Sequence, residues 1–590
     1  MFRYYSAVGA ATIVRGHMYV WFFRAVGGES QRSHSCPITR GGTMSDRHQD
    51  MSPLVDLTRR RVTGPSRSAH PVYVDLLPPC NHACPAGEDI QGWLALAQAG
   101  KYREAWDTLV RDNPMPAIHG RVCYHPCETA CNRAELDASV SIHAVERFLG
   151  DLAAAEQWPF KVQARSSGKR VLVIGGGPCG LSAAYHLARL GNTVEIHDAG
   201  PVAGGMMHFG IPAYRLPRAD LMREIQRIEA MGVTIVLNHK VTDVQAEITE
   251  GGFDAGFLAI GADVGKHVDI PARDAVRVLD AVSLLHDVQT GEAPLLGRRV
   301  IVYGGGNTAM DAARTVRRLG ADEALIVYRR DRAHMPAHDF EADEVIEEGI
   351  KIKWLTTITE IVGPQLTVEM MELDAGGRPQ PTGRFETLPA DAVVLALGQS
   401  TDSGFLRNVP GLSFGSDGTV VVGTNMMTGH PGLFAGGDAI EGEKSVTIAV
   451  GHGKRAARNI DAWLRETTYI ASPKAPVVTF PMLRLPVYSD ADPHPQRTLE
   501  AASRITGFEE VVQGLDAKAA RHEAQRCLSC GNCFECDNCF AACPETAIVR
   551  LGPTRGYQIN LDLCTGCAVC VEQCPCHAME MVPERGAVAP

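Results

Sequence analysis

Cysteine thiols are the residues of this 590-residue chain whose spacing points most directly to chemistry. Near the C-terminus the pattern C-x2-C-x2-C-x3-C-P occurs twice in succession, which marks an internal duplication. Short gaps let three thiolates of one copy hold three corners of an iron–sulfur cubane while the fourth reaches the other cubane. Paired zinc knuckles are the alternative, but zinc needs no reciprocal repeat. We therefore predict two [4Fe–4S] clusters, one on Cys533, Cys536, Cys539 and Cys574 and the other on Cys564, Cys567, Cys570 and Cys543.

The other cysteines form incomplete ligand groups at both ends of the chain. A [4Fe–4S] cluster takes four ligands, which no single group supplies. Only Cys179 lies in the long stretch between the two ends, and clustered thiols in a large chain indicate metal sites in a reducing compartment, so we expect a cytoplasmic protein. The groups are Cys80 with Cys84, Cys123 with Cys127 and Cys131, and Cys527 with Cys530.

A glycine-rich segment predicts a dinucleotide site. In KRVLVIGGGPCG a buried strand leads into Gly175, Gly177 and Gly180, a helical segment follows, and the next strand ends at Asp198. Such glycines permit a tight turn and a close approach of a diphosphate to the helix N-terminus, while the acid accepts a hydrogen bond from a ribose. Strand, helix and acid together make a strong signal for a dinucleotide-binding βαβ unit.

A second unit of this kind begins at RRVIVYGGGNTAMDAARTVRRLG, in the form G-x-G-x-x-A. Its next strand ends in two arginines where an NAD site usually has an acid. Arginine suits a ribose 2′-phosphate, which favours NADP(H), whereas NAD(H) is the alternative if the arginines only solvate the strand end. The residues expected at this nucleotide are Gly304, Gly306, Asn307, Ala309, Arg329 and Arg330.

The segments CNHACPAGEDI, GRVCYHPCETACNR and IHAVERFLGD resemble the N-terminal iron–sulfur domain of the glutamate synthase small subunit family, and the motif order after them resembles the two-dinucleotide-domain flavoproteins. The resemblance implies that the first unit binds FAD, that the second is an inserted NAD(P) domain, and that Asp438 bonds the ribityl chain. The other flavin-side residues that it implies are Gly204, Gly205, Arg215, Gly437 and Thr447.

The resemblance also implies ligand sets for the incomplete cysteine groups. The family's first cluster uses a C-x2-C pair just before PPCxxxCP, but here such a pair stands far away, before the C-terminal repeat. We hypothesise a composite cluster on Cys80, Cys84, Cys527 and Cys530; the alternatives are that Cys527 and Cys530 are unliganded or bind a separate zinc. The second predicted set is Cys123, Cys127, Cys131 and Glu146, although a helical glutamate is more often solvated. Cys36, Cys179 and Cys576 are left as bystanders.

The expected fold is an α/β flavoprotein with two dinucleotide-binding domains, an N-terminal all-α iron–sulfur domain and a C-terminal α+β bacterial-type ferredoxin domain. The first residues contain arginines with no acid before Glu29; a transit-type signal is one interpretation, and a mis-called start or disordered tail is the one we favour. The predicted segments are 1–43 for this doubtful start or tail, 44–165 for the helical [4Fe–4S] domain, 166–295 for the first segment of the FAD domain, 296–389 for the NAD(P) domain, 390–466 for the returning segment of the FAD domain, 467–526 for a linker and helical segment, and 527–590 for the ferredoxin-like domain.

These domains predict an NAD(P)-dependent oxidoreductase subunit that passes electrons between NAD(P)(H), FAD and about four [4Fe–4S] clusters. Hydride transfer between cofactors needs no acid–base group, so we expect no catalytic side chain. The net charge of −11 argues against nucleic acid, and no apolar run of about 18 residues predicts a membrane span. The expected partner is a glutamate synthase large subunit, a 2-oxoacid oxidoreductase or a ferredoxin. The alternative is a non-catalytic assembly or structural subunit with a vestigial flavin site.

Overall fold

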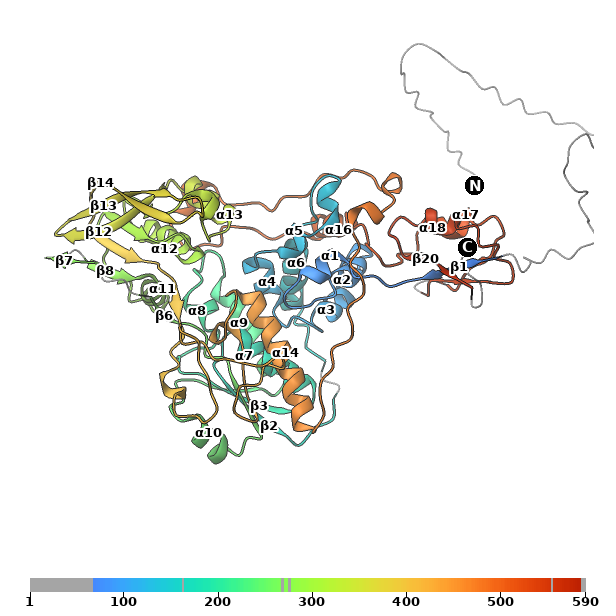
Figure 1. The fold of residues 1–590 in the computed structure, drawn as a ribbon, viewed down its shortest axis with the longest axis horizontal. Coiled ribbons are helices and arrows are strands. Elements are labelled where there is room, and N and C mark those ends of the chain that lie inside the picture. Colours follow the sequence, from blue (N-terminus) through green and yellow to red (C-terminus); the bar gives the residue numbers. More distant parts are fainter. Residues whose placement is uncertain (1–66, 162–163, 267–269, 274–276, 553–554, 585–590) are drawn as a thin grey trace, which may run out of the picture. The chain divides into compact units, whose positions relative to one another are not determined.

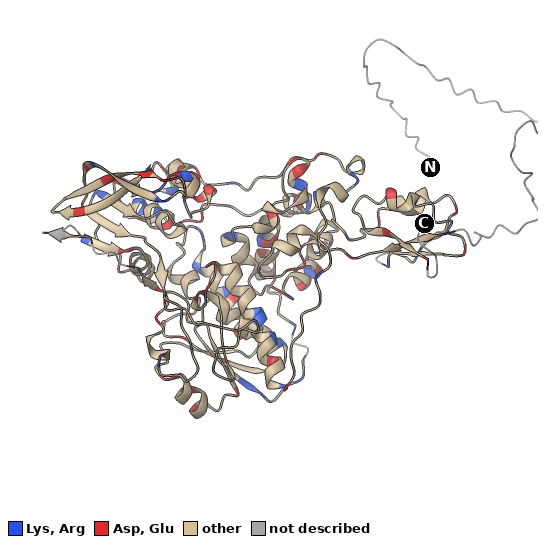
Figure 2. Cartoon of the chain, in the orientation of Figure 1, with Lys and Arg blue, Asp and Glu red and all other residues tan. Residues whose placement is uncertain are grey.

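The computed structural model describes residues 67–161, 164–266, 270–273, 277–552 and 555–584 (Figure 1). The chain divides into two units, Met1–Arg61 and Val62–Pro590, and all described residues belong to the second. The predicted tail, residues 1–43, lies outside the described residues. None of the described helices is both long and apolar enough to cross a membrane. Acidic and basic residues are mixed over the described helices and sheets rather than gathered by sign (Figure 2).

The N-terminal domain is helical because its apolar residues recur at helical spacing. In α2, for example, Ile90, Trp93, Leu94 and Ala97 are buried, and the Asp89 side chain caps the helix by accepting from Gly92 N. A C-terminal helix, α16 (Ala517–Gln525), packs on α2 and α6 and completes this core. The domain consists of α1 (Pro79–Ala83), α2 (Ile90–Gln98), α3 (Tyr102–Leu109), α4 (Pro116–Val122), α5 (Pro126–Thr129), η2 (Asn132–Glu135) and α6 (Ile142–Ala155).

The first dinucleotide domain is a parallel five-stranded sheet in the order β17-β5-β2-β3-β4. The central strands are continuous apolar runs, as in a sheet that helices cover. Helices α7 and α14 pack closely on each other. The elements are β2 (Arg170–Ile174), α7 (Pro178–Arg189), β3 (Thr193–His197), α8 (Met206–Phe209), α9 (Arg218–Glu229), β4 (Thr234–Val236), α10 (Val244–Gly251), β5 (Ala255–Leu258), β17 (Leu433–Ala435), η5 (Gly437–Ala439) and α14 (Val446–Leu464).

The second dinucleotide domain is a parallel sheet in the order β11-β10-β9-β15-β8, with the four-stranded sheet β14-β13-β12-β7 beside it. It extends beyond the predicted segment 296–389 at both ends, because β8 precedes the glycine loop and the apolar run of β15 pairs with β9. Its elements are β7 (Ala272–Arg273), β8 (Arg277–Asp280), α11 (Ala281–Thr290), β9 (Arg299–Tyr303), α12 (Asn307–Arg318), β10 (Glu323–Val327), η3 (Arg332–His334), α13 (Asp339–Glu347), β11 (Lys351–Lys353), β12 (Thr356–Val362), β13 (Gln365–Leu373), β14 (Pro379–Pro389) and β15 (Ala392–Leu395). The short strands β6 (Val264–Gly265) and β16 (Gln399–Ser400) pair beside it, and η4 (Gly404–Leu406) follows.

The C-terminal domain takes one strand from the opposite end of the chain. Strand β1 (Ala69–Tyr73) pairs antiparallel with β20 (Met579–Pro583), so these residues do not belong to the all-helical domain predicted for 44–165. The segment AHPVY carries no helical periodicity, and its partner strand is too far along the chain to be anticipated. The other described elements after α14 are η6 (Phe480–Met482), η7 (Leu485–Val487), α15 (Ala501–Arg504), α17 (Asn538–Ala542), β18 (Ile548–Arg550), β19 (Tyr557–Ile559) and α18 (Val569–Glu572).

Candidate functional site

The three glycines of the first loop meet three different structural requirements. Gly175 has a φ of +106°, which only glycine adopts without strain. A Cβ on Gly180 would lie 1.9 Å from the carbonyl oxygen of Gly175, so helix and strand could not pack with any larger residue. A Cβ on Gly177, in contrast, would meet nothing closer than Gly205 Cα at 4.0 Å. The space above Gly177 is what a diphosphate needs to approach the backbone.

This loop opens on a cavity of about 610 Å³. Asp198 lies at its wall and accepts from the backbone N–H groups of Gly176 at 2.6 Å and Gly200 at 2.7 Å, which fixes the carboxylate at the end of β3. Asp438 enters from η5, and burial raises the pKa of its carboxyl. The predicted residues that line the cavity are Gly175, Gly177, Asp198, Gly205, Gly437 and Asp438. Their donors and carboxylates fit an extended dinucleotide such as FAD.

Three of the predicted flavin-side residues do not line the cavity. Arg215 does not line the cavity; its Nη1 pairs with Asp311 Oδ2 and Glu341 Oε1, each at 2.8 Å, on α12 and α13. A buried guanidinium has a high desolvation cost, which pairing with the two carboxylates offsets. Thr447 is buried in the first turn of α14 and contacts Cys123 rather than the cavity. Gly204 stands behind the loop, where its N–H donates to Gly176 O at 2.9 Å.

The second glycine loop has the same structural requirements at its first two glycine positions. Gly304 has a φ of +154°, and a Cβ there would lie 2.2 Å from Ala396 O, whereas a Cβ on Gly306 meets open space. Ala309 is fully buried where the first loop has Gly180. The two strand-end arginines differ: Arg329 is exposed, and Arg330 donates from Nε to Tyr328 Oη at 2.9 Å.

The Asn307 side chain forms hydrogen bonds to other protein groups, and its role at the nucleotide stays a prediction. Its Nδ2 donates to the Tyr124 hydroxyl at 2.6 Å, and its Oδ1 accepts from His338 N at 3.2 Å. Tyr124 comes from the helical domain, directly after Cys123, and its ring stacks on His338 with centroids 3.9 Å apart. The sequence offered no signal for this contact, because a lone tyrosine beside a cysteine has no characteristic spacing.

One group of four thiols contains cysteines from both ends of the chain and differs from the predicted set by one residue. Cys80, Cys131, Cys527 and Cys530 line a single small pocket. Burial raises the pKa of the Cys80 thiol, and the neighbouring thiols of Cys527, Cys131 and Cys530 raise it further. Asn132 Nδ2 donates to Cys530 Sγ at 3.5 Å. Cys131 therefore stands where we had expected Cys84, while the joining of the two ends is as hypothesised.

The remaining three N-terminal thiols gather around Glu146. Burial raises the pKa of the Cys127 thiol, and the nearby Cys123, Cys84 and Glu146 add to the effect. The structure groups these thiols differently from the predicted partition. Cys80 lies within α1, whereas Cys84 follows its last turn in extended conformation. Spacing alone could not distinguish these two partitions.

Glu146 is buried, so it is not the solvated helical glutamate that was the alternative. Its Oε1 accepts from Asn113 Nδ2 at 2.7 Å, and the same amide also contacts Glu88 Oε1 at 3.0 Å and His119 Nδ1 at 2.9 Å. Burial is the first cause that raises the pKa of the Glu146 carboxyl, and the nearby Glu88 is the second. This network holds a carboxylate against three thiols, a donor set suited to a [4Fe–4S] cluster.

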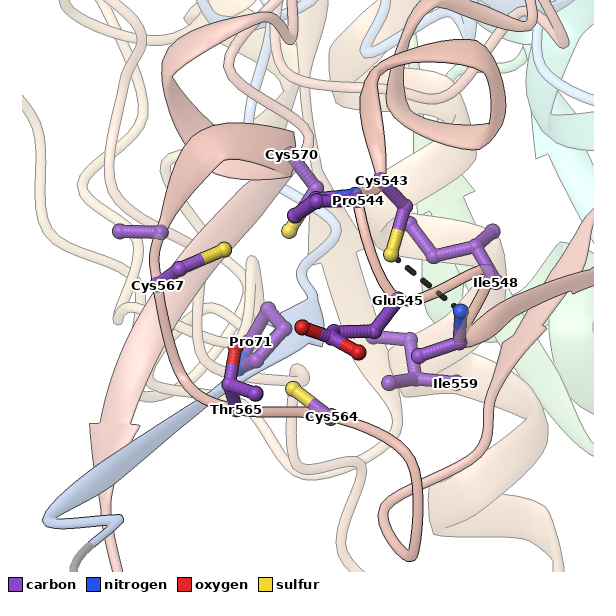
Figure 3. Close-up of a pocket in the computed structure, with 12 residues that line it drawn as sticks. Pro71, Cys543, Pro544, Glu545, Ile548, Ile559, Cys564, Thr565, Cys567 and Cys570 are labelled. Carbon is purple, nitrogen blue, oxygen red and sulfur yellow. Dashed lines mark hydrogen bonds between the residues drawn. The ribbon is translucent and has the colours of Figure 1, made fainter. Parts of the chain in front are cut away.

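The C-terminal repeat folds into the two reciprocal groups that the spacing predicts. Figure 3 shows sulfurs of both copies converging, with Pro71 of β1 and the Glu545 carboxylate beside them. In the other group, the fourth cysteine of the second copy, Cys574, lies among the first three of the first copy. Tyr73 Oη lies 3.2 Å from Cys539 Sγ, which again brings in the N-terminal strand. The group in Figure 3 consists of Cys543, Cys564, Cys567 and Cys570.

Cys576, which we expected to be a bystander, lies at the junction of two thiol groups. It is buried, its Sγ donates to Asn532 O at 3.2 Å, and it lies 3.9 Å from Cys574 Sγ. Its carbonyl accepts from Gly531 N at 2.6 Å, one residue after Cys530. Tyr488 closes the same junction by donating to Leu528 O at 2.7 Å. Cys179 remains apart, packed beside Gly436 and Gly437 at the large cavity.

Comparisons with known proteins agree with this arrangement. The family model for pyridine nucleotide-disulphide oxidoreductases matches residues 169–453, that for dihydropyrimidine dehydrogenase domain II with a 4Fe-4S cluster matches 76–158, and a 4Fe-4S binding domain matches 557–580. The NADP(+)-dependent formate dehydrogenase subunit beta of Moorella thermoacetica is 36% identical over 498 residues, covering 77% of this chain and 70% of that protein. The glutamate synthase [NADPH] small chain of Escherichia coli is 32% identical over 418 residues, covering 66% and 89%. This chain belongs to the iron–sulfur flavoprotein family of the glutamate synthase small chain.

A third relative, the NADPH-Fe(3+) oxidoreductase subunit beta of Geobacter sulfurreducens, is 32% identical over 505 residues and covers 77% of this chain and 75% of that protein. The iron–sulfur flavoprotein described here is thus an NAD(P)-dependent oxidoreductase with FAD and [4Fe–4S] clusters as cofactors. The large cavity and its carboxylates fit FAD, and the four thiol groups fit cubane clusters. All three relatives are named as small or beta subunits.

Proposed function

We propose that this subunit carries electrons along one ordered series, from NADP(H) through FAD and four [4Fe–4S] clusters to a partner at the ferredoxin end. Bound flavin exchanges a hydride with nicotinamide and single electrons with iron–sulfur clusters. The protein side chains hold these groups in sequence. The observation that supports the proposal is that short segments of the protein connect the thiol groups one after another.

The step from FAD to the first cluster is placed at α14, the helix beside the flavin cavity. Thr447 in its first turn contacts Cys123, and Lys454 further along donates to the carbonyl oxygens of Ala86 and Gly87 at 2.8 and 2.9 Å, just after Cys84. The same helix packs against the α7 segment that lines the cavity. The group of Cys84, Cys123, Cys127 and Glu146 is therefore the one that we place next to FAD.

The series then continues towards the C-terminal domain. The two cysteines of C-x3-C lead from the first group to the shared group that contains Cys80 and Cys530. Gly531 and Cys576 connect the shared group to the ferredoxin group that contains Cys574. The group of Figure 3 comes last and is the one that we propose faces the partner; its Cys567 is exposed, as is Cys533 of the preceding group.

NADP(H) is the proposed nucleotide because Arg329 and Arg330 follow β10, and because the three relatives are named as NADP or NADPH proteins. An Arg329→Ala/Arg330→Ala variant should bind NADP+ more weakly while binding of NAD+ stays the same. Titration calorimetry on the oxidised, cofactor-loaded protein measures both. Equal weakening of the two nucleotides would remove the 2′-phosphate assignment.

The partner that we propose is a redox subunit or ferredoxin that exchanges electrons with the exposed end of the series, with formate dehydrogenase, iron(III)-reducing and glutamate synthase assemblies as the models from the named relatives. Purification of the native complex without oxygen and identification of its subunits would decide among them. Because reduced thiols are required at every group, we also propose a cytoplasmic location.

The ordered series is tested by breaking it at the shared cluster. In a Cys527→Ala/Cys530→Ala variant, NADPH should still reduce FAD and the cluster at Cys123, whereas both ferredoxin clusters should stay oxidised. Freeze-quench EPR of the reconstituted protein separates these signals. Reduction of the ferredoxin clusters at the wild-type rate would refute the order, and a wild-type protein that binds no flavin after reconstitution would favour a non-catalytic assembly subunit.

A further inference from the structure

The helical iron–sulfur domain reaches the nucleotide loop of the second dinucleotide domain through Tyr124. The Tyr124 hydroxyl accepts from Nδ2 of Asn307, the first residue of α12, and its ring lies flat on His338. Asn307 follows Gly306 directly, the position at which an added Cβ would meet open space. The N-terminus of a twelve-residue helix after such a glycine receives the diphosphate of a dinucleotide. The Tyr124 hydroxyl therefore lies at the edge of the diphosphate position.

The proton of the Tyr124 hydroxyl is available to donate a hydrogen bond. The oxygen accepts from Asn307 Nδ2 at 2.6 Å; burial raises the pKa of the phenol, and the nearby Arg215 guanidinium lowers it. Both neighbours are donors, and the guanidinium is held in place by Asp311 and Glu341. A phenol oxygen that accepts from such donors still carries one proton of its own. Among the residues that the structure describes, no acceptor is paired with that proton.

We propose that Tyr124 is a nucleotide-binding residue whose hydroxyl donates to a diphosphate oxygen of the bound NAD(P)(H). This inference rests on the proposed function, because it takes the second loop as the nucleotide site. The iron–sulfur domain then completes the site from the residue next to Cys123, with Asn307 and Arg215 fixing the hydroxyl rather than touching the nucleotide. An anion is the acceptor that suits a donor set beside a helix N-terminus.

The test compares Tyr124→Phe with the wild type in the oxidised, cofactor-loaded protein. Phenylalanine keeps the ring on His338 and removes only the hydroxyl. Calorimetric titration with NADP+ should show a Kd about ten- to a hundredfold higher, the loss expected for one hydrogen bond to a charged group. Adenosine 2′-monophosphate, which has no diphosphate, should bind the variant and the wild type equally. Tyr102→Phe is the matched control, since its hydroxyl donates to Ala517 O in the same domain.

Each result decides the proposal. An unchanged Kd for NADP+ in Tyr124→Phe would overturn it, as would an equal loss for adenosine 2′-monophosphate, which would indicate damage to the loop instead of a lost donor. A fall in NADP+ affinity in Tyr102→Phe of the same size would also overturn it. If the wild type binds NAD+ and not NADP+, the proposed nucleotide preference fails, and the same comparison with NAD+ and with adenosine, which has no phosphate, still tests Tyr124.

Discussion

The partition of the N-terminal thiols can be read from the iron content of paired alanine variants. Cys84 lies with Cys123 in one group, and Cys527 belongs to the group shared between the two ends. Loss of one of four ligands should cost a whole cluster, so each single variant should lose about four irons. The two partitions differ in whether the second substitution increases the iron loss caused by the first.

Cys84→Ala/Cys123→Ala removes two ligands of one group and should still lose only about four irons, whereas Cys84→Ala/Cys527→Ala touches two groups and should lose about eight. The partition hypothesised from the family resemblance, with Cys84 beside Cys527, gives the opposite values. Iron is measured by mass spectrometry after anaerobic reconstitution, and flavin absorbance is recorded in parallel to show that the dinucleotide domain is intact.

Cys179→Ala is the control, because this buried thiol packs beside Gly436 and Gly437 and belongs to no thiol group. It should retain the full iron content. Our grouping would be refuted if the Cys84→Ala/Cys527→Ala variant lost no more iron than either single variant. A loss of about eight irons from Cys84→Ala/Cys123→Ala would refute it as well.

Three further perturbations follow from buried contacts. Gly306→Ala should keep FAD and weaken nucleotide binding, whereas Gly180→Ala should lose FAD because its Cβ would lie 1.9 Å from a carbonyl oxygen; equal flavin contents would contradict this. Burial raises the pKa of Glu224 to about 7, so the stability it contributes is complete below its unfolded pKa and is lost as the pH rises through about 7. Glu224→Gln should therefore gain on the order of 3 kcal/mol over the wild type between pH 5 and pH 8, and parallel melting curves against pH would argue otherwise. Arg215→Met leaves two buried carboxylates unpaired and should destabilise the protein by about 3–5 kcal/mol in urea unfolding, while an unchanged midpoint would show that the pair is solvated.

The dinucleotide loops were predictable because their chemistry is local. Strand, turn and helix follow one another within a few residues, and each glycine position has its own physical demand. Gly175 needs a positive φ, Gly177 needs empty space and Gly180 needs a close helix–strand contact. The same reasoning applies to the C-terminal repeat, in which the duplication itself fixes the reciprocal ligand sets.

The thiol partition was not predictable because it depends on where one short helix ends. Cys80 and Cys84 fit either group by spacing, and only the extended conformation after α1 separates them. The position of Arg215 was not predictable for a related reason. A motif indicates which residues lie near a loop, but it does not indicate which buried carboxylates will form ion pairs with an arginine. Tyr124 had no sequence signal at all, because its partner Asn307 lies in another domain.

The shared thiol group has a consequence for folding as well as for electron transfer. The segment that carries Cys527 and Cys530 also supplies Ala524 to the core of the N-terminal domain, and Arg526 is buried with its guanidinium donating to Ala138 O at 2.6 Å. Closing so long a loop costs conformational entropy, which grows only slowly with loop length. A cluster bound by both ends adds its binding free energy to that closure. The N-terminal domain therefore depends on the C-terminal segment for both its core and its ligands.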